Sequence, residues 1–321
     1  MNRMIRAALA TVLALAPAWA AAQAYPSKPV KVVVSTVPGP LDAYARIILE
    51  KMSTSLKQPF VVENKAGAGG NVAAEFVKGQ PADGYTLLFS IDTTFTVNPS
   101  VYKKLPFDPV KDFSPITRTG AATIIFVASP SIGAKTIKDL IALAKAKPRE
   151  LNFGSPGSGT PHHLAGELLK TTAGIDLIHI PYKGAAPAVA DLLGGQVHTV
   201  FVSLPAALPH VKSGKLIGLG ITSPGRSAVA PELPTFAEQG LGGYALENWY
   251  GLLAPARTPT DIILKLNRET VKALQMADVK ERLTGLGFET RTSTPDEFAV
   301  YIKSEIVKWA AIVKASGAKV D

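Results

Sequence analysis

The stretch from residue 151 to residue 174 carries the residue types best suited to binding an anion. Residues 151–153 end a predicted strand, residues 154–159 form a loop of glycine and serine, and Thr160 with Pro161 has the residue types that start a helix. The free backbone N–H groups of such a helix start, together with glycine amides and nearby hydroxyls, favour an anionic oxygen. The chemistry indicated is capture of a carboxylate, and the alternative is an ordinary strand-to-helix turn that binds nothing.

Two enzyme motifs with similar glycine spacing fail in this loop. Gly154 and Gly159 have the spacing of a phosphate-binding loop, but Thr160 stands where that loop requires lysine. Neither Ser155 nor Ser158 has glycine two residues away on both sides, so the nucleophile elbow is missing as well. The chain has no cysteine, and no serine, histidine and acid form a triad by spacing, so we predict no catalytic residue.

The histidines do not indicate a metal site. His163 and Glu167 share a helical face, but no third ligand and no HExxH pattern accompany them. His163 should be neutral near a helix start, because the helix dipole opposes an added positive charge. It would then either donate one hydrogen bond to an acid or cap its own turn. We expect no metal and no cofactor.

The first 24 residues predict a secretory signal peptide. Arg3 and Arg6 give a positive start, residues 7–16 are apolar, and Ala22-Gln23-Ala24 is a small-residue cleavage site. Maturity would begin at Tyr25, in the periplasm, because the chain has no cysteine for a lipid anchor and no later apolar run long enough to span a bilayer. The remaining lysines and arginines are scattered, which argues against binding of nucleic acid.

The strand, loop and helix around residue 154 have a counterpart earlier in the chain. Residues 30–34 predict a strand, residues 35–41 a glycine and proline loop, and residues 42–56 a helix. Asp42 could serve as a base, but its position at the helix start makes N-capping the simpler role. The repetition suggests two similar halves whose helix starts face one ligand. Ser90 and Thr93 follow another predicted strand at the end where α/β sheets place ligands, although capping of the local turn is an alternative.

Two segments are predicted to cross between domains. Residues 98–119 are rich in proline and are expected to be loop, and residues 244–253 would return the chain to the first domain. Trp249 in the second segment would line the cleft or pack the hinge. Paired connections of this kind are natural hinges for closure around a ligand.

Helix caps mark the C-terminal third of the chain. Thr258 is expected to cap one helix, Thr294 with Glu297 has the spacing of a capping box, and Gly317 would end the last helix. The expected division is a signal peptide at 1–24, domain 1 at 25–122 with 250–321, and domain 2 at 123–249.

Short motifs along nearly the whole mature chain resemble those of the Bug-type extracytoplasmic solute receptors, the binding components of tripartite tricarboxylate transporters. The matching runs are YPSKP (25–29), VENKAGAGG (62–70), DGYTLL (83–88), LPFDP (105–109) with KDF (111–113), NFGS (152–155) with GSGT (157–160), PYKG (181–184), DLLGGQ (191–196) and LPTFAEQG (233–240).

The resemblance implies an α/β, two-domain periplasmic binding protein fold of type II, with two crossover segments and a ligand cleft between the domains. It further implies a monomer that captures a small organic carboxylate and delivers it to the membrane permease of a tripartite tricarboxylate transporter, without catalysis. The alternatives are an enzyme acting on a carboxylate and a sensor or scaffold module. The residues expected to bind the ligand are Val37, Gly39, Leu41, Asp42, Ser90, Thr93, Ser155, Gly157, Ser158, Gly159, Thr160, His163, Tyr182, Gly184, Ala185 and Ser203.

The first binding loop departs from the pattern of that family. The family usually has two glycines and a threonine before the aspartate, whereas this chain has Gly39, Pro40 and Leu41 before Asp42. Leu41 could offer an apolar surface in place of a hydroxyl. Our hypothesis is therefore that the ligand is a less polar or aromatic carboxylate.

Overall fold

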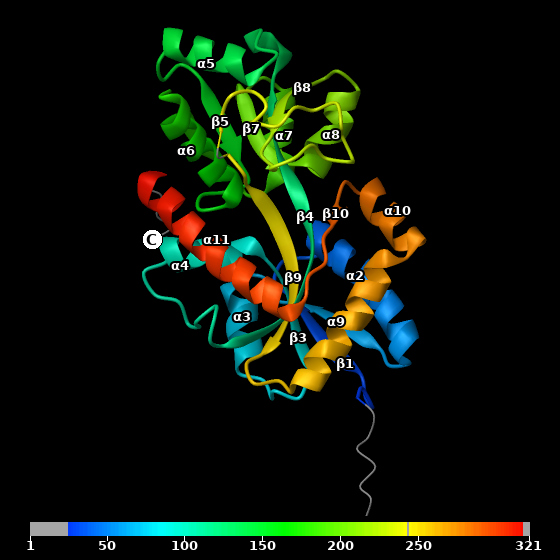
Figure 1. Cartoon of the computed structure of the whole chain (residues 1–321). Coiled ribbons are helices and arrows are strands. Elements are labelled where there is room, and N and C mark those ends of the chain that lie inside the picture. Colours follow the sequence, from blue (N-terminus) through cyan, green and yellow to red (C-terminus); the bar gives the residue numbers. More distant parts are fainter. Residues whose placement is uncertain (1–24, 243, 317–321) are drawn as a thin grey trace, which may run out of the picture.

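Two α/β lobes make up the structure, a computed structural model that describes residues 25–242 and 244–316 (Figure 1). The predicted signal peptide and Gly317 lie outside the described residues. Among the helices of the described ranges, none is long and apolar enough to cross a membrane.

The first lobe is built on a mixed sheet whose strand order is β2-β1-β3-β9-β4-β10. β1 is parallel to β2 and β3, whereas β9 is antiparallel to both of its neighbours, β3 and β4. The strands are β1 (Val30–Val34), β2 (Phe60–Asn64), β3 (Thr86–Ile91), β9 (Glu247–Pro255), β10 (Glu289–Thr290) and the first part of β4 (Phe113–Ala128).

The second lobe repeats this arrangement with other strands. Its order is β8-β4-β7-β5-β6, in which β5 is parallel to β6 and β7. The order β6-β5-β7-β4 thus corresponds to β2-β1-β3-β9, which confirms the two similar halves expected from the repeated strand, loop and helix. The strands are β5 (Asn152–Ser155), β6 (Ile178–Pro181), β7 (Thr199–Ser203) and β8 (Ile217–Ile221).

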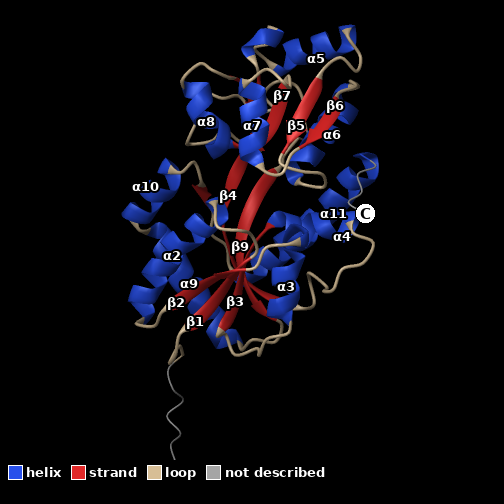
Figure 2. Cartoon of the chain, turned by 180° about the vertical axis from the view of Figure 1, so that it is seen from behind, coloured by secondary structure: helices blue, strands red, loops and turns tan. Residues whose placement is uncertain are grey.

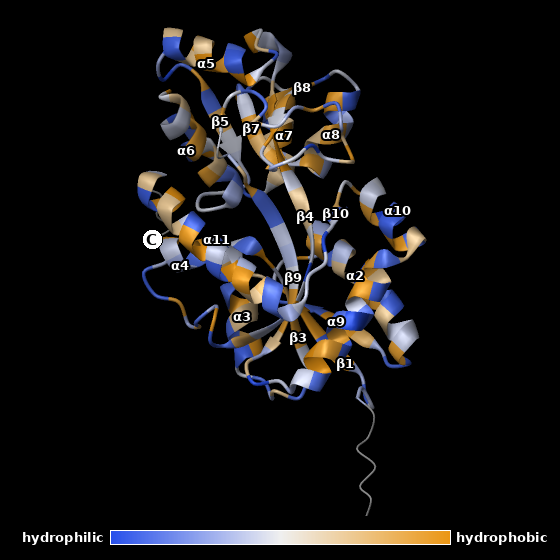
Figure 3. Cartoon of the chain, in the orientation of Figure 1, coloured by the Kyte–Doolittle hydropathy of each residue, from blue (hydrophilic) through white to orange (hydrophobic). Residues whose placement is uncertain are grey.

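Strand β4 belongs to both sheets. Its residues up to Thr123 pair with β9, and from Ile124 onward they pair with β7 and β8. β9 begins beside the same point, because Glu247 pairs with Thr123. The start of β9 is hydrophilic where it crosses between the lobes, and the strand becomes hydrophobic inside the first lobe (Figure 3).

Helices cover both faces of each sheet (Figure 2). Those of the first lobe are α2 (Pro40–Leu56), η2 (Ala68–Gly70), α3 (Asn71–Lys78), η3 (Thr93–Val97), α4 (Asn98–Val101), α9 (Thr260–Gln275), α10 (Ala277–Gly285) and α11 (Pro295–Ser316). Those of the second lobe are η4 (Pro130–Ile132), α5 (Ile137–Ala146), α6 (Pro161–Ala173), α7 (Ala185–Leu193) and α8 (Leu204–Lys212).

Each sheet has an apolar core on both of its faces. In the first lobe, α2, α9 and α10 pack on one face, and α3 and the first half of α11 pack on the other. In the second lobe, α5 and α6 cover one face, and α7 and α8 cover the other. Trp309 of α11 belongs to the core of the second lobe, so the last helix packs against both lobes (Figure 1). Trp249 packs edge-on against Phe298 and is fully buried, which favours its structural interpretation.

The prediction that residues 98–119 are loop is wrong at both ends. Residues 98–101 form α4, and β4 begins at Phe113. Pro115 is compatible with the strand because the register of the β4–β9 ladder shifts beside it, where no N–H is required.

Two expected helix caps are also wrong. α2 begins at Pro40 with Gly39 as its N-cap, which leaves Asp42 inside the first turn. The Thr258 hydroxyl donates to the Pro255 carbonyl at 2.8 Å, and α9 starts after Pro259. The capping box of Thr294 and Glu297 is confirmed by both of its hydrogen bonds.

Candidate functional site

The parallel strands of both lobes end at the crossing between them. Ile91 at the end of β3 pairs with Tyr250, which pairs with Gly120 of β4. On the other side, Ser203 at the end of β7 pairs with Ile124 of the same strand. Positions 120 and 124 are four residues apart, or about 13 Å along a strand. The loops after β1 and β3 therefore face the loops after β5, β6 and β7.

The first of these loops joins β1 to α2. Val37 is 64% exposed, and Gly39 is half-buried at the N-cap of α2. The amides of Leu41 and Asp42 in the first turn of α2 have no acceptor in the part of the chain that the structure describes. The Leu41 side chain itself lies in the apolar core and is 4% exposed.

Asp42 is tied to its own helix. One carboxylate oxygen, Oδ2, accepts a hydrogen bond from Arg46 Nε at 2.8 Å. This hydrogen bond holds the pKa of the Asp42 carboxyl below its usual value, so the group is a carboxylate at neutral pH. The side chain therefore neutralises Arg46 and does not act as an N-cap or a base.

The end of β3 carries a buried network of hydroxyl groups. Ser90 Oγ lies 3.0 Å from Ser35 Oγ and 3.1 Å from Thr94 Oγ1, and Ser90 is fully buried. Both donors of Thr93 bind Asp92 Oδ1, the amide at 2.6 Å and the hydroxyl at 3.2 Å. Burial raises the pKa of the Asp92 carboxyl well above its usual value. These hydroxyls brace the start of η3 from within.

The loop between β5 and α6 is closed by its own hydrogen bonds. The Thr160 hydroxyl donates to the Gly157 carbonyl at 2.7 Å and accepts from the His163 amide, which confirms Thr160 as the N-cap. The Gly157 amide donates to Ser155 Oγ, and the Gly159 amide donates to His163 Nδ1 at 3.1 Å. Ser155 is fully buried, so its hydroxyl does not reach the surface.

Two histidine rings stack behind this loop. The ring centroids of His163 and His179 are 3.9 Å apart, and Phe153 packs 4.8 Å from His179. His179 Nε2 lies 2.7 Å from Ser155 Oγ. Burial lowers the pKa of His163 to about 4 and that of His179 to about 3, so both rings are neutral at neutral pH. The neighbouring ring of His162 is buried too, and its pKa is lowered to about 4.

The remaining predicted residues lie at the ends of β6 and β7. Gly184 is the N-cap of α7 and donates its amide to the Pro156 carbonyl at 3.0 Å, while Ala185 is the first helical residue. The Tyr182 hydroxyl donates to Asp191 Oδ2 at 2.9 Å, which turns it toward α7. Ser203 is the N-cap of α8 without a side-chain cap bond.

The donors left over are backbone amides at helix starts. Within residues 25–242 and 244–316, no acceptor binds the amides of Leu41 and Asp42 in α2, Ser158 and His162 at α6, or Ala185 in α7. Helices α2, α6 and α7 all follow strands that end at the crossing, and their dipoles favour an anion there. This differs from the expectation that the hydroxyls of Ser155 and Thr160 contribute, because both already bind the protein.

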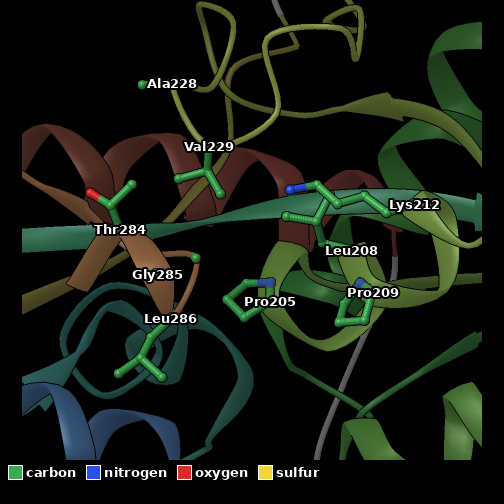
Figure 4. Close-up of a pocket in the computed structure, with 10 residues that line it drawn as sticks. Pro205, Leu208, Pro209, Lys212, Ala228, Val229, Thr284, Gly285 and Leu286 are labelled. Carbon is green, nitrogen blue, oxygen red and sulfur yellow. The ribbon is translucent and has the colours of Figure 1, made fainter. Parts of the chain in front are cut away.

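One cavity between the lobes lies beside this region. This cavity, about 450 Å³, has walls from α8 and from the end of α10 and is lined by Pro205, Leu208, Lys212, Val229 and Leu286 among others (Figure 4). None of the sixteen predicted residues lines it. A single cavity shared by the Gly39 and Gly157 loops thus stays a prediction.

Sequence reasoning missed the role of His179, whereas Asp92 caps the local turn, as the alternative for Ser90 and Thr93 predicted. His179 was visible as a polar residue in an otherwise apolar strand. Its partners, Ser155 and His163, come from other parts of the chain and could not be inferred from spacing.

A serine in contact with a histidine raises the question of hydrolysis. The Ser155–His179 pair has a nucleophile and a base at 2.7 Å, but the serine hydroxyl is fully buried and both rings lie beneath the loop. A substrate carbonyl cannot reach this hydroxyl, so the pair braces the loop.

The fold is that of the periplasmic binding proteins. It has two repeated α/β lobes, strands that cross between them, and helices that start at the crossing. Residues 44–318 match the model of the tripartite tricarboxylate transporter family receptor. The chain belongs to this family.

Similar proteins agree with this assignment. Protein BugT of Bordetella pertussis is 37% identical over 300 residues, which cover 93% of this chain and 92% of BugT. The solved structure of Rpa4515 from R. palustris with adipate has a TM-score of 0.83 at 33% identity, covering 92% of this chain and 99% of that one. The structure of MatC from Rhodopseudomonas palustris with bound malate has a TM-score of 0.78 at 32% identity, covering 90% of this chain and 100% of that one. Because the family is described as a transporter receptor, the chain is a receptor and not an enzyme.

Proposed function

We propose that this receptor captures a small organic carboxylate between its lobes and delivers it to the membrane permease of a tripartite tricarboxylate transporter. The observation that carries the proposal is the set of open backbone amides at helix starts on both sides of the crossing. Adipate and malate in the two similar solved structures are small organic carboxylates, which supports the same class of ligand here.

The binding would rest on backbone donors and helix dipoles and not on a cationic side chain. Each dipole contributes about 0.3 to 1 kcal/mol at an exposed site, and more when closure of the lobes excludes water. The ligand-binding residues would be the accessible ones of the sixteen, in the loops after β1, β5, β6 and β7. The buried ones, including Ser90, Thr93 and His163, would support them.

The lobes would correspond to residues 25–122 with 250–321 and to residues 123–249. The change of pairing partner at Thr123 and Ile124 supports the first boundary, and the start of β9 at Glu247 lies near the second. We also propose that the first 24 residues are removed on export to the periplasm and that the mature receptor acts as a monomer.

Isothermal calorimetry with malate, adipate, citrate and benzoate tests the function on the mature chain. We expect one site per chain, at least one acid with micromolar or tighter binding, and no chemical change of the recovered acid. Preference for benzoate would support the less polar ligand expected from the altered first binding loop, but not a contact with Leu41, whose side chain is buried in the core. Failure of every carboxylate to bind, or turnover of a bound one, would refute the proposal.

A further inference from the structure

The backbone amides of the β5–α6 loop alternate in direction, since those of Gly157 and Gly159 point into the protein and that of Ser158 does not. Two histidines contact the inward amides, His163 directly and His179 through Ser155. Gly157 and Gly159 donate their amides into the protein, and the Ser158 amide between them has no acceptor in the described residues. Ser158 is exposed, whereas Gly159 is buried. Of the amides of residues 157, 158 and 159, only that of Ser158 is therefore open to an anion.

His163 holds the Gly159 amide directly. The N–H of Gly159 donates to Nδ1 of the ring at 3.1 Å, so Nδ1 must carry a lone pair and the proton of the neutral ring is on Nε2. Nε2 faces Glu167 Oε1 at 3.8 Å, which suits a ring nitrogen that carries its proton. Gly159 has a φ of 72°, a left-handed conformation that this hydrogen bond helps to fix.

His179 holds the Gly157 amide through Ser155. Its Nε2 lies 2.7 Å from Ser155 Oγ, and this oxygen accepts the Gly157 amide at 3.3 Å. The stacking of the two rings at 3.9 Å and the contact of His179 with Phe153 fix both rings against β5. One ring thus uses its δ nitrogen and the other its ε nitrogen.

We infer that His163 and His179 are positioning residues that turn the Gly159 and Gly157 amides inward and so leave the Ser158 amide free for an anionic ligand. Neither ring donates to the ligand, so of the two roles considered for His163 from the sequence the structure favours the cap of its own turn. The inference rests on the proposed function for its consequence in binding, and on the hydrogen bonds alone for its consequence in the loop.

The different ring nitrogens give a crossed test. The side-chain oxygen of asparagine occupies the place of Nδ1 in histidine, and that of glutamine occupies the place of Nε2. His163→Asn should therefore keep the Gly159 bond and His163→Gln should lose it, whereas His179→Gln should keep the bond to Ser155 and His179→Asn should lose it. Loss of one such hydrogen bond weakens binding about fivefold to tenfold.

Two measurements on these four variants of the mature chain decide the matter. Calorimetry uses the acid of highest affinity among malate, adipate, citrate and benzoate. His163→Asn should bind this acid more tightly than His163→Gln, and His179→Gln should bind it more tightly than His179→Asn. Amide hydrogen exchange by NMR should show faster exchange of Gly159 in His163→Gln and of Gly157 in His179→Asn, each relative to its partner variant. Binding by the wild type should be constant from about pH 5.5 to about pH 8.

A purely structural role for the rings would give the same order of Asn and Gln at both positions, and this result in the exchange data would overturn the inference. If the wild type binds none of the four acids, the proposed function fails, and the exchange rates still decide the inference. If the wild type binds and the exchange pattern is crossed but all affinities are equal, the Ser158 amide does not contact the ligand and the inference fails in its functional part.

Discussion

Replacing Gly39 by aspartate should fill the anion site at α2 with a carboxylate of the protein itself. Gly39 is the N-cap of α2, and its φ of 168° is extended backbone that any residue adopts. A Cβ at this position meets no atom closer than the Val37 carbonyl oxygen at 3.8 Å. The Asp side chain can therefore accept the amides of Leu41 and Asp42, as an N-cap aspartate does.

The expected effects on stability and on binding have opposite signs. Relative to Gly39→Ala, the aspartate variant should be more stable by about 1 kcal/mol, because an N-cap acceptor is restored. Its affinity for the carboxylate should be lower by about 1.5 to 3 kcal/mol, the value of hydrogen bonds to a charged group, which is about tenfold to about 150-fold.

Calorimetry and urea unfolding of the Ala, Asn and Asp variants at position 39 measure both effects. Asn provides the cap without the charge, and Ala leaves both amides of α2 open. Equal affinity of the Asp and Ala variants would refute the reasoning, because it would show that the α2 amides do not contact the ligand. A stable Asp variant excludes misfolding as the cause of weak binding.

Two further predictions concern stability. Because His163 and His179 have folded pKa values of about 4 and about 3, below that of an exposed histidine, the unfolded chain binds more protons between those values and about pH 6.5. The contribution of the two neutral rings to the free energy of unfolding should be fully present above pH 6.5 and should be lost as the pH falls toward 4. A midpoint of urea unfolding that is constant over this range would contradict the burial of these rings. Gly166→Ala should destabilise the fold by about 1 to 3 kcal/mol because its Cβ would lie 2.1 Å from Phe153, whereas Gly285→Ala, which meets no atom within 4 Å, should not; equal unfolding midpoints would show that the ring has room to move.

Local signals in the sequence were sufficient for many of the elements. The apolar run of residues 30–34 gave β1 with the bounds of the structure. Thr160 with Pro161 and Thr294 with Glu297 marked helix starts because capping depends on residues three positions apart.

Pairing between distant segments set the limit of prediction. β4 was read as loop up to residue 119, because proline in isolation indicates a break and the bulge that accommodates Pro115 is formed with β9, far along the chain. The same limit applies to the site. The residue types in the β5–α6 loop indicated an anion site, but whether a hydroxyl or amide is free depends on partners such as His179 on another strand.

Strand β4, sixteen residues long, belongs to both sheets and lies between two other strands in each of them. Unfolding of one lobe would therefore remove a central strand from the other. The two halves should then melt together in one cooperative transition, in contrast to proteins whose domains are joined by a flexible linker. A change that weakens the core of one lobe would lower the melting temperature of the whole receptor.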